Sequence, residues 1–241
     1  MVALRVVSAV VAAVAVAMCA AGDQAKAGAG DNPSFLLFSG TDIWRYGGFL
    51  YGGFLWSPKG LDTDGFTFKM LLDGGAYSYV SGGLQQTVDG TKLSAAALPG
   101  WRFTRDGLNV AVFAGPLVQD YRLMPTDPGS RLHGPYAGGE TAVDIWYQPN
   151  AMTMAAFNAA ITSIGPTGYV RGAIGIRAFN AAFVGPEIEQ IWCADFNELE
   201  LGAHLTGLHV DSTEWSMAGG WALTSDQRSG PYVRLGVNAR Y

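Results

Sequence analysis

Val233-Arg-Leu-Gly-Val-Asn-Ala-Arg-Tyr241, the last nine residues of the chain, alternate strictly between two kinds of side chain. The odd positions are all apolar, whereas arginine, glycine and asparagine fill the even positions. A period of two places one set of side chains on each face of a β-strand. A final amphipathic strand that ends on an aromatic residue is typical of a bacterial outer-membrane β-barrel. The same pattern also suits the closing strand of a soluble sheet.

The beginning of the chain predicts export. Arg5 supplies positive charge, residues 6–21 form an almost uninterrupted apolar run, and a small-x-small cleavage site ends at Ala27. This arrangement is typical of a secretory signal peptide. A membrane anchor is the alternative, but the run is shorter than the roughly 20 apolar residues that a spanning helix needs. We therefore predict a cleaved signal over residues 1–27 and a single domain over residues 28–241.

Composition narrows the class of protein. Loss of the signal would leave Cys193 as the single cysteine, so we expect no disulfide framework. The formal net charge of −5 argues against nucleic acid as a partner. Charged residues make up only 15% of the chain, aromatic residues make up 12%, and 33 residues are glycine. A barrel wall that faces lipid has this composition, and so does a soluble glycine-rich β protein.

The alternation of the last nine residues recurs along the chain. In residues 198–206, leucine and alanine occupy the odd positions, and in residues 170–178 apolar or small residues occupy the even ones. Glycine, β-branched and aromatic residues crowd these segments, which disfavours helices. We predict twelve strands, near residues 34–44, 46–57, 66–79, 91–103, 108–119, 135–147, 151–163, 168–179, 182–192, 197–209, 214–224 and 231–241.

The connections between these strands differ in length. Tight connectors fall at residues 104–107, 148–150, 180–181 and 210–213. They alternate with longer or more irregular ones at residues 80–90, 120–134, 164–167, 193–196 and 225–230, with 58–65 as a longish exception. Short turns at one end and longer loops at the other are typical of outer-membrane barrels. An even number of strands places both chain ends on the short-turn side, which would be the periplasm.

The two faces of the strands differ in charge. One face is apolar, and the other carries both signs: Lys69, Arg102, Arg171, Arg177, Arg234, Asp73, Glu140, Asp144, Glu187, Glu189, Glu198 and Glu200. In a soluble barrel the apolar face points inward. In an outer-membrane barrel it meets lipid, and the polar face lines the lumen. We predict the second arrangement: an all-β, up-and-down antiparallel transmembrane β-barrel of about twelve strands, with an ion-paired lumen.

Aromatic residues near the segment ends suit the girdles that lie at membrane interfaces. These residues are Trp44, Trp56, Trp101, Tyr147, Trp192, Trp221 and Tyr241.

Motifs that carry chemistry are absent from the sequence. It has no Walker loop, no Rossmann fingerprint, no His-Glu-x-x-His and no Cys-x-x-Cys. The three histidines, His133, His204 and His209, have no metal-ligand spacing. We therefore predict no catalytic, cofactor-binding or metal-binding residues.

Two groups of residues keep an enzymatic alternative open. The pairs Glu187/Glu189 and Glu198/Glu200 each share a strand face, and a glycosidase needs two carboxylates at a set separation. We expect these carboxylates to form ion pairs with Arg171, Arg177 and Arg234 in the lumen instead. The second group is His209, Ser212 and Glu214, which cluster near one turn in the way that a lipid-modifying barrel enzyme would require.

Eight short motifs follow one another across nearly the whole chain after the signal. They are Phe38-Ser-Gly-Thr-Asp-Ile-Trp44, Tyr51-Gly-Gly-Phe-Leu-Trp-Ser-Pro-Lys-Gly60, Leu98-Pro-Gly-Trp-Arg-Phe103, Val112-Phe-Ala-Gly-Pro116, Asp144-Ile-Trp-Tyr-Gln-Pro149, Ile164-Gly-Pro166, Val184-Gly-Pro-Glu187 and Arg228-Ser-Gly-Pro-Tyr232. Their order resembles that of the cellulose biosynthesis protein BcsS family. The resemblance implies an all-β envelope protein with an accessory role in bacterial cellulose production or export. It implies no catalytic residue set.

Three functions follow as hypotheses. The first is a non-enzymatic outer-membrane barrel that serves cellulose biosynthesis or export as a scaffold or a narrow channel. The second is an outer-membrane enzyme that modifies lipid or glucan, and the third is a soluble periplasmic barrel that binds a ligand. A charged lumen favours a scaffold over a glucan channel, since Trp146 is the one clear aromatic platform expected there. The expected partners are outer-membrane lipid, the barrel-insertion machinery, and the cellulose synthase complex or glucan.

Overall fold

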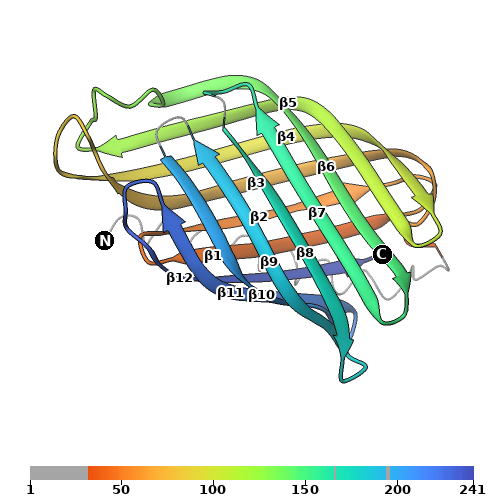
Figure 1. The fold of residues 1–241 in the computed structure, drawn as a ribbon. Helices are drawn as coiled ribbons and strands as arrows, with labels where there is room; N and C mark the ends of the chain where they lie inside the picture. Colours follow the sequence, from red (N-terminus) through yellow and green to blue (C-terminus); the bar gives the residue numbers. More distant parts are fainter. Residues whose placement is uncertain (1–31, 166, 194–195) are drawn as a thin grey trace.

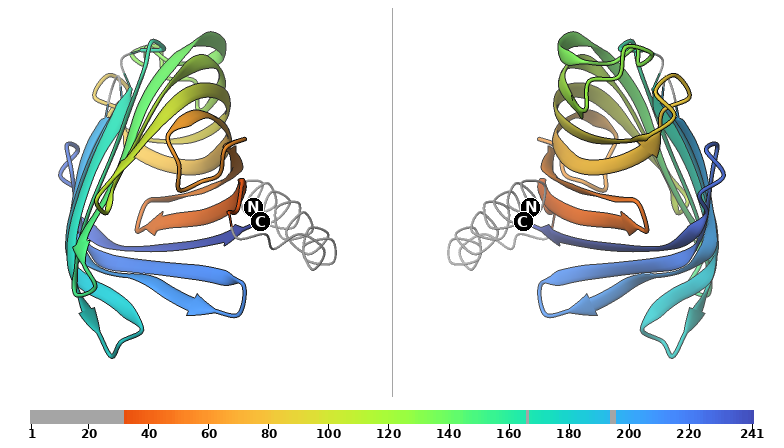
Figure 2. Two further views of the ribbon diagram at one scale, coloured as in Figure 1. Left: turned by 90° about the vertical axis from the view of Figure 1, so that its right-hand side faces the viewer. Right: turned by 90° about the vertical axis from the view of Figure 1, so that its left-hand side faces the viewer.

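A computed structural model describes residues 32–165, 167–193 and 196–241. These residues form a closed barrel of antiparallel strands, in which each strand pairs with its neighbours in sequence and β12 pairs with β1 (Figures 1 and 2). The strands are β1 (Phe35–Trp44), β2 (Gly47–Trp56), β3 (Gly65–Val80), β4 (Thr87–Arg105), β5 (Leu108–Met124), β6 (Gly134–Asn150), β7 (Thr153–Thr162), β8 (Gly168–Ala178), β9 (Ala182–Cys193), β10 (Phe196–Val210), β11 (Thr213–Thr224) and β12 (Gly230–Arg240). The predicted up-and-down barrel of about twelve strands is confirmed.

The signal peptide over residues 1–27 lies outside the described residues. Among the described residues, no helix is long and apolar enough to cross a membrane.

The last strand closes the sheet. β12 runs antiparallel to β1, from Leu36 opposite Arg240 to Trp44 opposite Tyr232. Beyond these pairs, the backbone amides of Ser34 and Phe35 donate hydrogen bonds to the Tyr241 carbonyl oxygen at 2.8 and 2.9 Å. Closure removes the unpaired edges that an open sheet would present.

Side chains alternate between the outer wall and the interior. On β12, Val233 and Leu235 are 51% and 42% exposed, whereas Arg234 between them is 6% exposed. Other large apolar side chains are exposed on the same outer face: Leu72, Leu93, Val118, Phe157, Ile174, Ile188, Leu201 and Trp221. Apolar side chains therefore cover the outside and charged side chains lie inside, which is the arrangement of a membrane-spanning barrel.

The interior also has an apolar half, which the sequence analysis did not predict. Buried leucine, alanine and aromatic side chains cluster inside β2 to β6: Leu55, Ala96, Leu98, Ala111, Phe113, Leu117 and Tyr121. In β5 both faces are largely apolar, so alternation alone does not indicate which face points inward.

Loops add to the apolar half at both ends. Leu61 in the β2–β3 loop, Leu132 in the β5–β6 loop and Ile164 in the β7–β8 loop are 2%, 6% and 5% exposed, and they belong to the same cluster. Buried apolar side chains therefore occur in this half of the interior from one end of the barrel to the other.

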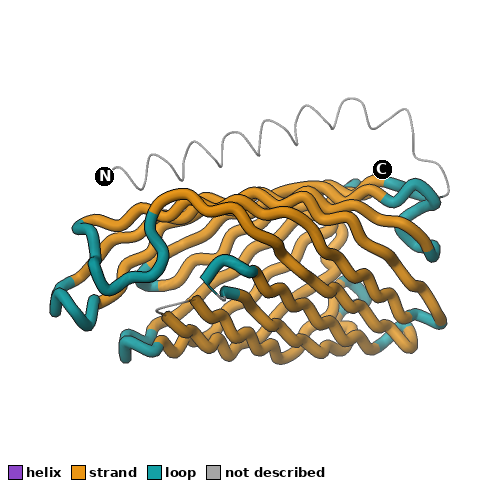
Figure 3. The backbone as a smooth tube through the Cα atoms, turned by 90° about the horizontal axis from the view of Figure 1, so that it is seen from above, coloured by secondary structure: helices purple, strands orange, loops and turns teal. Residues whose placement is uncertain are grey.

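The connections gather at the two ends of the barrel (Figure 3). The tight turns that follow β4, β6, β8 and β10 share an end with Ser34 and Tyr241, as predicted, and residues 57–64 are the longer exception there. Asp106 and Gly107 both have positive φ, 44° and 80°, as a two-residue hairpin turn requires. At the opposite end, only residues 45–46 separate β1 from β2 and only residues 194–195 separate β9 from β10, so the asymmetry in loop length is partial.

Charge placed on the outer wall tests whether that wall faces hydrocarbon. Leu72, near the middle of β3, is 51% exposed, and Val80 at the end of the same strand is 43% exposed. Leu72→Arg should lower the free energy of unfolding in lipid vesicles by about 2–4 kcal/mol, and Val80→Arg by at most about 1 kcal/mol. Equilibrium unfolding in denaturant measures both values. Equal, small effects of the two substitutions would contradict a lipid-facing wall.

Candidate functional site

Arg234 on β12 is the centre of an ion-pair network inside the barrel. Its Nε and Nη2 atoms donate to Asp42 Oδ2 on β1 at 2.8 and 2.7 Å. Nη2 also lies 2.6 Å from Glu189 Oε2 on β9 and contacts Glu200 on β10. Nη1 lies 3.2 Å from Glu187 Oε1. One guanidinium therefore links carboxylates from three strands.

Arg171 on β8 supplies a second guanidinium to the network. Its Nη2 and Nε atoms donate to Glu187 Oε2 at 2.7 and 3.2 Å, and Nε lies 4.0 Å from Glu189 Oε2. The Tyr232 hydroxyl donates to Glu187 Oε1 at 2.8 Å. Glu187 thus has partners on both β8 and β12, which binds the last strand to the middle of the sheet.

Strand register explains how these side chains meet. Arg234 is directly opposite Asp42 on one side and Ala218 on the other. Because the Ala218 side chain is small, the Arg234 side chain can cross β11 to reach the carboxylates on β10 and β9. Glu189 and Glu200 are themselves opposite each other. The network therefore forms because five strands, β1, β8, β9, β10 and β12, each turn these side chains toward the interior.

Acidic groups outnumber basic groups in this part of the interior. The carboxylates of Asp42, Glu187, Glu189 and Glu200 contact the guanidiniums of Arg171 or Arg234, and Glu198 lies two residues before Glu200 on the same face of β10. Glu198 is 1% exposed, and its Oε1 atom has no hydrogen-bond partner among the described residues. Burying an unpaired carboxylate costs free energy. The guanidinium of Arg234 is therefore the main compensation for this acidic cluster.

A second group of charges crosses the other half of the interior. Lys69 on β3 forms an ion pair with Asp144 on β6, and its Nζ atom lies 4.4 Å from the centre of the Phe113 ring. Asn158 on β7 donates to Asp144 Oδ1 at 3.0 Å, and Lys92 pairs with Asp73 at 3.0 Å. Since outer side chains diverge on a convex wall, a contact from β3 to β6 runs through the interior.

The interior charges confirm most of the predicted lumen set. Glu187, Glu189 and Glu200 form ion pairs with Arg171 or Arg234, as expected. The expected pairing of Arg177 with these acids is wrong, because Arg177 Nε donates to the Ala151 carbonyl at 2.7 Å. Its guanidinium carbon also lies 4.5 Å from the centre of the Phe183 ring.

Two members of the network were missed by sequence reasoning. Asp42 and Tyr232 lie on β1 and β12, and neither was assigned to the lumen. Apolar residues occupy both faces of β1, from Phe35 and Leu37 to Leu36 and Phe38, so its phase was ambiguous. Only the pairing of Asp42 with Arg234 resolves that phase.

The histidine candidates lie apart from one another. His204 is buried, with Nδ1 2.9 Å from the Thr206 hydroxyl and Nε2 3.1 Å from the Ile174 carbonyl oxygen. His209 Nε2 lies 3.7 Å from Glu214 Oε2 at the exposed short-turn end, where the β10–β11 turn also holds Ser212. His133 lies in the β5–β6 loop. No group of His, Cys, Asp and Glu in the described ranges is arranged to hold a metal ion.

The aromatic residues predicted to form girdles do not all lie on the outer wall. Trp56, Trp101, Tyr147 and Trp221 are exposed on the outer wall, as predicted. Trp44 is a correction: it stacks on Phe49 at a ring distance of 5.8 Å and packs against Tyr232 inside the barrel. Its neighbour Ile43, 53% exposed, takes the outward position instead.

Trp146 lies inside the barrel, as predicted. Its ring meets the Phe183 ring edge-on at a centroid distance of 6.2 Å.

Loops at the end opposite the termini are tied to the wall. Arg228 of the β11–β12 loop pairs with Asp226 at 2.8 Å, lies 4.2 Å from the centre of the Tyr46 ring and donates to the Ser78 carbonyl on β3. Asp127 of the β5–β6 loop accepts hydrogen bonds from the Tyr79 hydroxyl and the Gly129 amide, both at 2.9 Å. These contacts hold two loops over the mouth of the barrel.

Removing the Arg234 guanidinium should be costly, because the buried carboxylates around it would lose their main partner. We expect Arg234→Ala to lower the free energy of unfolding by about 3–5 kcal/mol. Arg122→Ala is the matched control: Arg122 pairs with Asp120 but its side chain is 80% exposed. That control should cost at most about 1 kcal/mol. Similar losses for the two variants in equilibrium unfolding would contradict a central role of Arg234.

The Asp127 loop contact should depend on pH. Hydrogen bonds from the Ser81 hydroxyl and then the Gly129 amide hold the pKa of Asp127 below its usual value. A depressed pKa in the folded state stabilises the loop above the unfolded pKa, and this contribution is lost as pH falls through the folded pKa. Hydrogen exchange of residues 125–133, corrected for intrinsic rates, should therefore show less protection in acid. Asp127→Asn should flatten this dependence; an unchanged profile would contradict the assignment.

Comparisons with solved structures find other barrels at low sequence identity. A KdgM porin is 11% identical with a TM-score of 0.44, over 86% of this chain and 99% of that one. LpxR from Salmonella typhimurium is 9% identical with a TM-score of 0.49, over 86% and 100%. The beta domain of the Bordetella autotransporter BrkA is 13% identical with a TM-score of 0.49, over 88% and 100%. At these sequence identities and TM-scores, the similarities to the three solved structures carry no argument about function.

Sequence comparison is more specific. No curated protein matches this chain. The family model described as "Cellulose biosynthesis protein BcsS" matches residues 36–241, which include all but the first residue of the described strands. The resemblance seen in the sequence motifs is thereby confirmed, and the chain belongs to the cellulose biosynthesis protein BcsS family.

Proposed function

We propose that this BcsS-family protein is a non-enzymatic barrel of the bacterial outer membrane that supports cellulose biosynthesis or export as a scaffold. Family membership supports the link to cellulose, and the apolar outer wall supports residence in lipid. In this proposal, the signal over residues 1–27 directs export and is removed. The termini and the tight turns then face the periplasm.

The packed interior is the observation that favours a scaffold over a channel. Side chains that line an open, water-filled pore would be exposed to that water. Here Leu98, Glu198, Glu200 and Tyr232 are at most 2% exposed, and they come from three strands, β4, β10 and β12. A glucan chain would have to displace the Arg234 network or the apolar cluster to pass.

A scaffold acts through its ends and its wall. The proposed partners are the cellulose synthase complex or its glucan product, met at the loop-bearing ends, together with outer-membrane lipid around the wall. The barrel-insertion machinery would recognise the last strand, which ends at Tyr241. No nucleic acid or cofactor belongs to this proposal.

A narrow channel is the second candidate. The contacts that hold the β5–β6 and β11–β12 loops over the mouth are hydrogen bonds, ion pairs and ring contacts, and such contacts can be exchanged. In a channel, release of these loops would precede passage of a glucan. The lipid- or glucan-modifying enzyme has weaker support, since the His209–Glu214 pair is the closest approach to its predicted cluster.

Conductance separates the scaffold from the channel. The purified, folded protein should give no steady single-channel current in planar bilayers, because its interior is packed. Reproducible conductance steps from the wild-type protein would contradict the scaffold and favour the channel. Arg234→Ala is a useful comparison, since loss of the network should produce leak where the wild type has none.

Fractionation and gene deletion test the cellular part of the proposal. The protein should sediment with the outer membrane and migrate differently on gels before and after boiling. Deletion of its gene should reduce extracellular cellulose or alter its form, and wild-type copies should restore it. Recovery in the soluble periplasm would overturn the membrane assignment, and unaltered cellulose in the deletion strain would overturn the assigned role.

A further inference from the structure

A row of aromatic side chains lies inside the barrel near the end opposite the termini. Trp44 on β1, Phe49 on β2, and Tyr77 and Tyr79 on β3 follow one another at ring-centroid distances of 5.8, 6.2 and 6.2 Å. Successive ring planes differ by only 5°, 18° and 24°. These rings therefore form a strip of nearly parallel planes, which we call the aromatic row.

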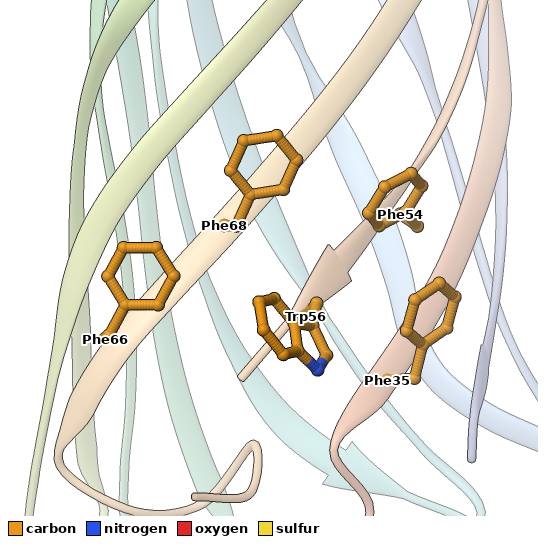
Figure 4. Close-up of a pocket in the computed structure, with 5 residues that line it drawn as sticks. All are labelled: Phe35, Phe54, Trp56, Phe66 and Phe68. Atoms are coloured by element: carbon orange, nitrogen blue, oxygen red, sulfur yellow. The ribbon is translucent and has the colours of Figure 1, made fainter. Parts of the chain in front are cut away.

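Strand phase places the aromatic row on the inner face of the wall. The outer face of the same strands carries other rings, which Figure 4 shows around a shallow depression: Phe35 of β1, Phe54 and Trp56 of β2, and Phe66 and Phe68 of β3. On each strand, the rings of the row occupy positions of the opposite parity. Because successive side chains of a strand point to opposite faces, the two sets of rings lie on separate surfaces.

Glycine lets the rings of the row lie flat against the sheet. Three of them are each directly opposite a glycine of the next strand: Trp44 opposite Gly47, Phe49 opposite Gly75, and Tyr77 opposite Gly90. A Cβ atom on any of these glycines would lie 2.5–2.6 Å from the ring that covers it. One face of each ring therefore rests on backbone, and the other face is turned toward the interior. All members of the row are half-buried, in contrast to the fully buried side chains deeper in the barrel.

Charged groups border the aromatic row. Lys92 Nζ lies 5.9 Å from the centre of the Phe49 ring and pairs with Asp73 at 3.0 Å, and both side chains are partly exposed. At the other end of the row, the Tyr79 hydroxyl donates to Asp127 Oδ2 at 2.9 Å. An aliphatic ligand would cover these polar groups and offer them no hydrogen bonds, which costs free energy. A ligand with both apolar faces and hydroxyl groups suits the rings and the charges together.

We propose that the aromatic row binds a β-1,4-linked glucan chain at the mouth of the barrel. In this polymer every ring substituent is equatorial, so both faces of each sugar carry only C–H bonds and can stack on an aromatic ring. The hydroxyl groups at the edges of the sugars would reach Asp73, Lys92 and Asp127. The spacing of the aromatic rings is comparable to the length of one sugar unit along an extended chain. An α-1,4-linked glucan coils, so its sugars would not follow a row of nearly parallel rings.

This inference rests on the proposed role in cellulose biosynthesis and deepens it, because it names the polymer and the place that holds it. The aromatic row runs from β1 across β2 to β3, along the inner side of one end of the barrel. A glucan bound there would lie across the mouth and would not have to pass the Arg234 network. The site therefore suits a scaffold that holds the polymer at its loop-bearing end.

Isothermal titration calorimetry of the purified, folded protein, in a detergent without a sugar headgroup, tests the site with two probes. The wild type should bind cellohexaose, which is β-1,4-linked, more tightly than maltohexaose, which is α-1,4-linked. Tyr77→Ala and Phe49→Ala should each weaken cellohexaose binding about tenfold, the loss expected for one stacking ring. Tyr77→Phe should bind like the wild type, because it keeps the ring.

Two residues of the outer wall supply controls of the same residue types. Tyr147 on β6 and Phe103 on β4 are 42% and 50% exposed. Tyr147→Ala and Phe103→Ala should keep the wild-type affinity, and gel migration before and after boiling verifies that every variant is folded.

Three results would overturn the site: no cellohexaose binding by the folded wild type, equal affinity for the two oligosaccharides, or undiminished affinity in either Tyr77→Ala or Phe49→Ala. Equal losses in the outer-wall controls would overturn it as well. Because these measurements use purified protein, such results would leave the assignment to cellulose biosynthesis to the gene deletion.

Discussion

The pairing of β12 with β1 is the contact on which the rest of the barrel depends. In hydrocarbon, every backbone amide and carbonyl group needs a partner within the protein, and only helices and closed sheets satisfy this requirement. The register from Leu36–Arg240 to Trp44–Tyr232 supplies those partners to both terminal strands. It also brings Asp42 opposite Arg234, so the same contact that closes the wall completes the interior network.

The interior combines two solutions to the problem of filling a barrel of this size. One half is mainly apolar, from Leu55 to Leu117, with Leu61 and Leu132 added by loops. The ion pairs Lys69–Asp144 and Lys92–Asp73 also cross this half. The other half is filled by ion pairs around Arg234. Apolar packing has little directional preference, whereas ion pairs require specific partners. Ion pairs in both halves therefore require particular strands to be close to one another, and the apolar cluster adds packing that is less selective.

Alternation predicted the fold well where the two faces of a strand differ in polarity. Val233–Tyr241 and residues 198–206 were assigned correctly, because charge on one face leaves a single sensible orientation. Prediction failed where both faces are apolar: the interior cluster around Phe113 was not foreseen, and Trp44 was assigned to the wrong side. Asp42 was missed for the same reason, since its role appears only when two ends of the chain meet. Long-range pairing of that kind is not encoded in any local period.

The position of Arg234 in the sequence has a consequence for the order of assembly. The acids that it neutralises lie on β1, β9 and β10, all of which precede it in the chain. Until β12 joins the sheet, those acidic side chains lack the Arg234 guanidinium, and Arg171 on β8 reaches only Glu187 and Glu189. Pairing of β12 with β1 thus closes the wall and supplies this guanidinium at the same time. The acidic side chains of β1, β9 and β10 therefore gain their shared partner only when the last strand is in place.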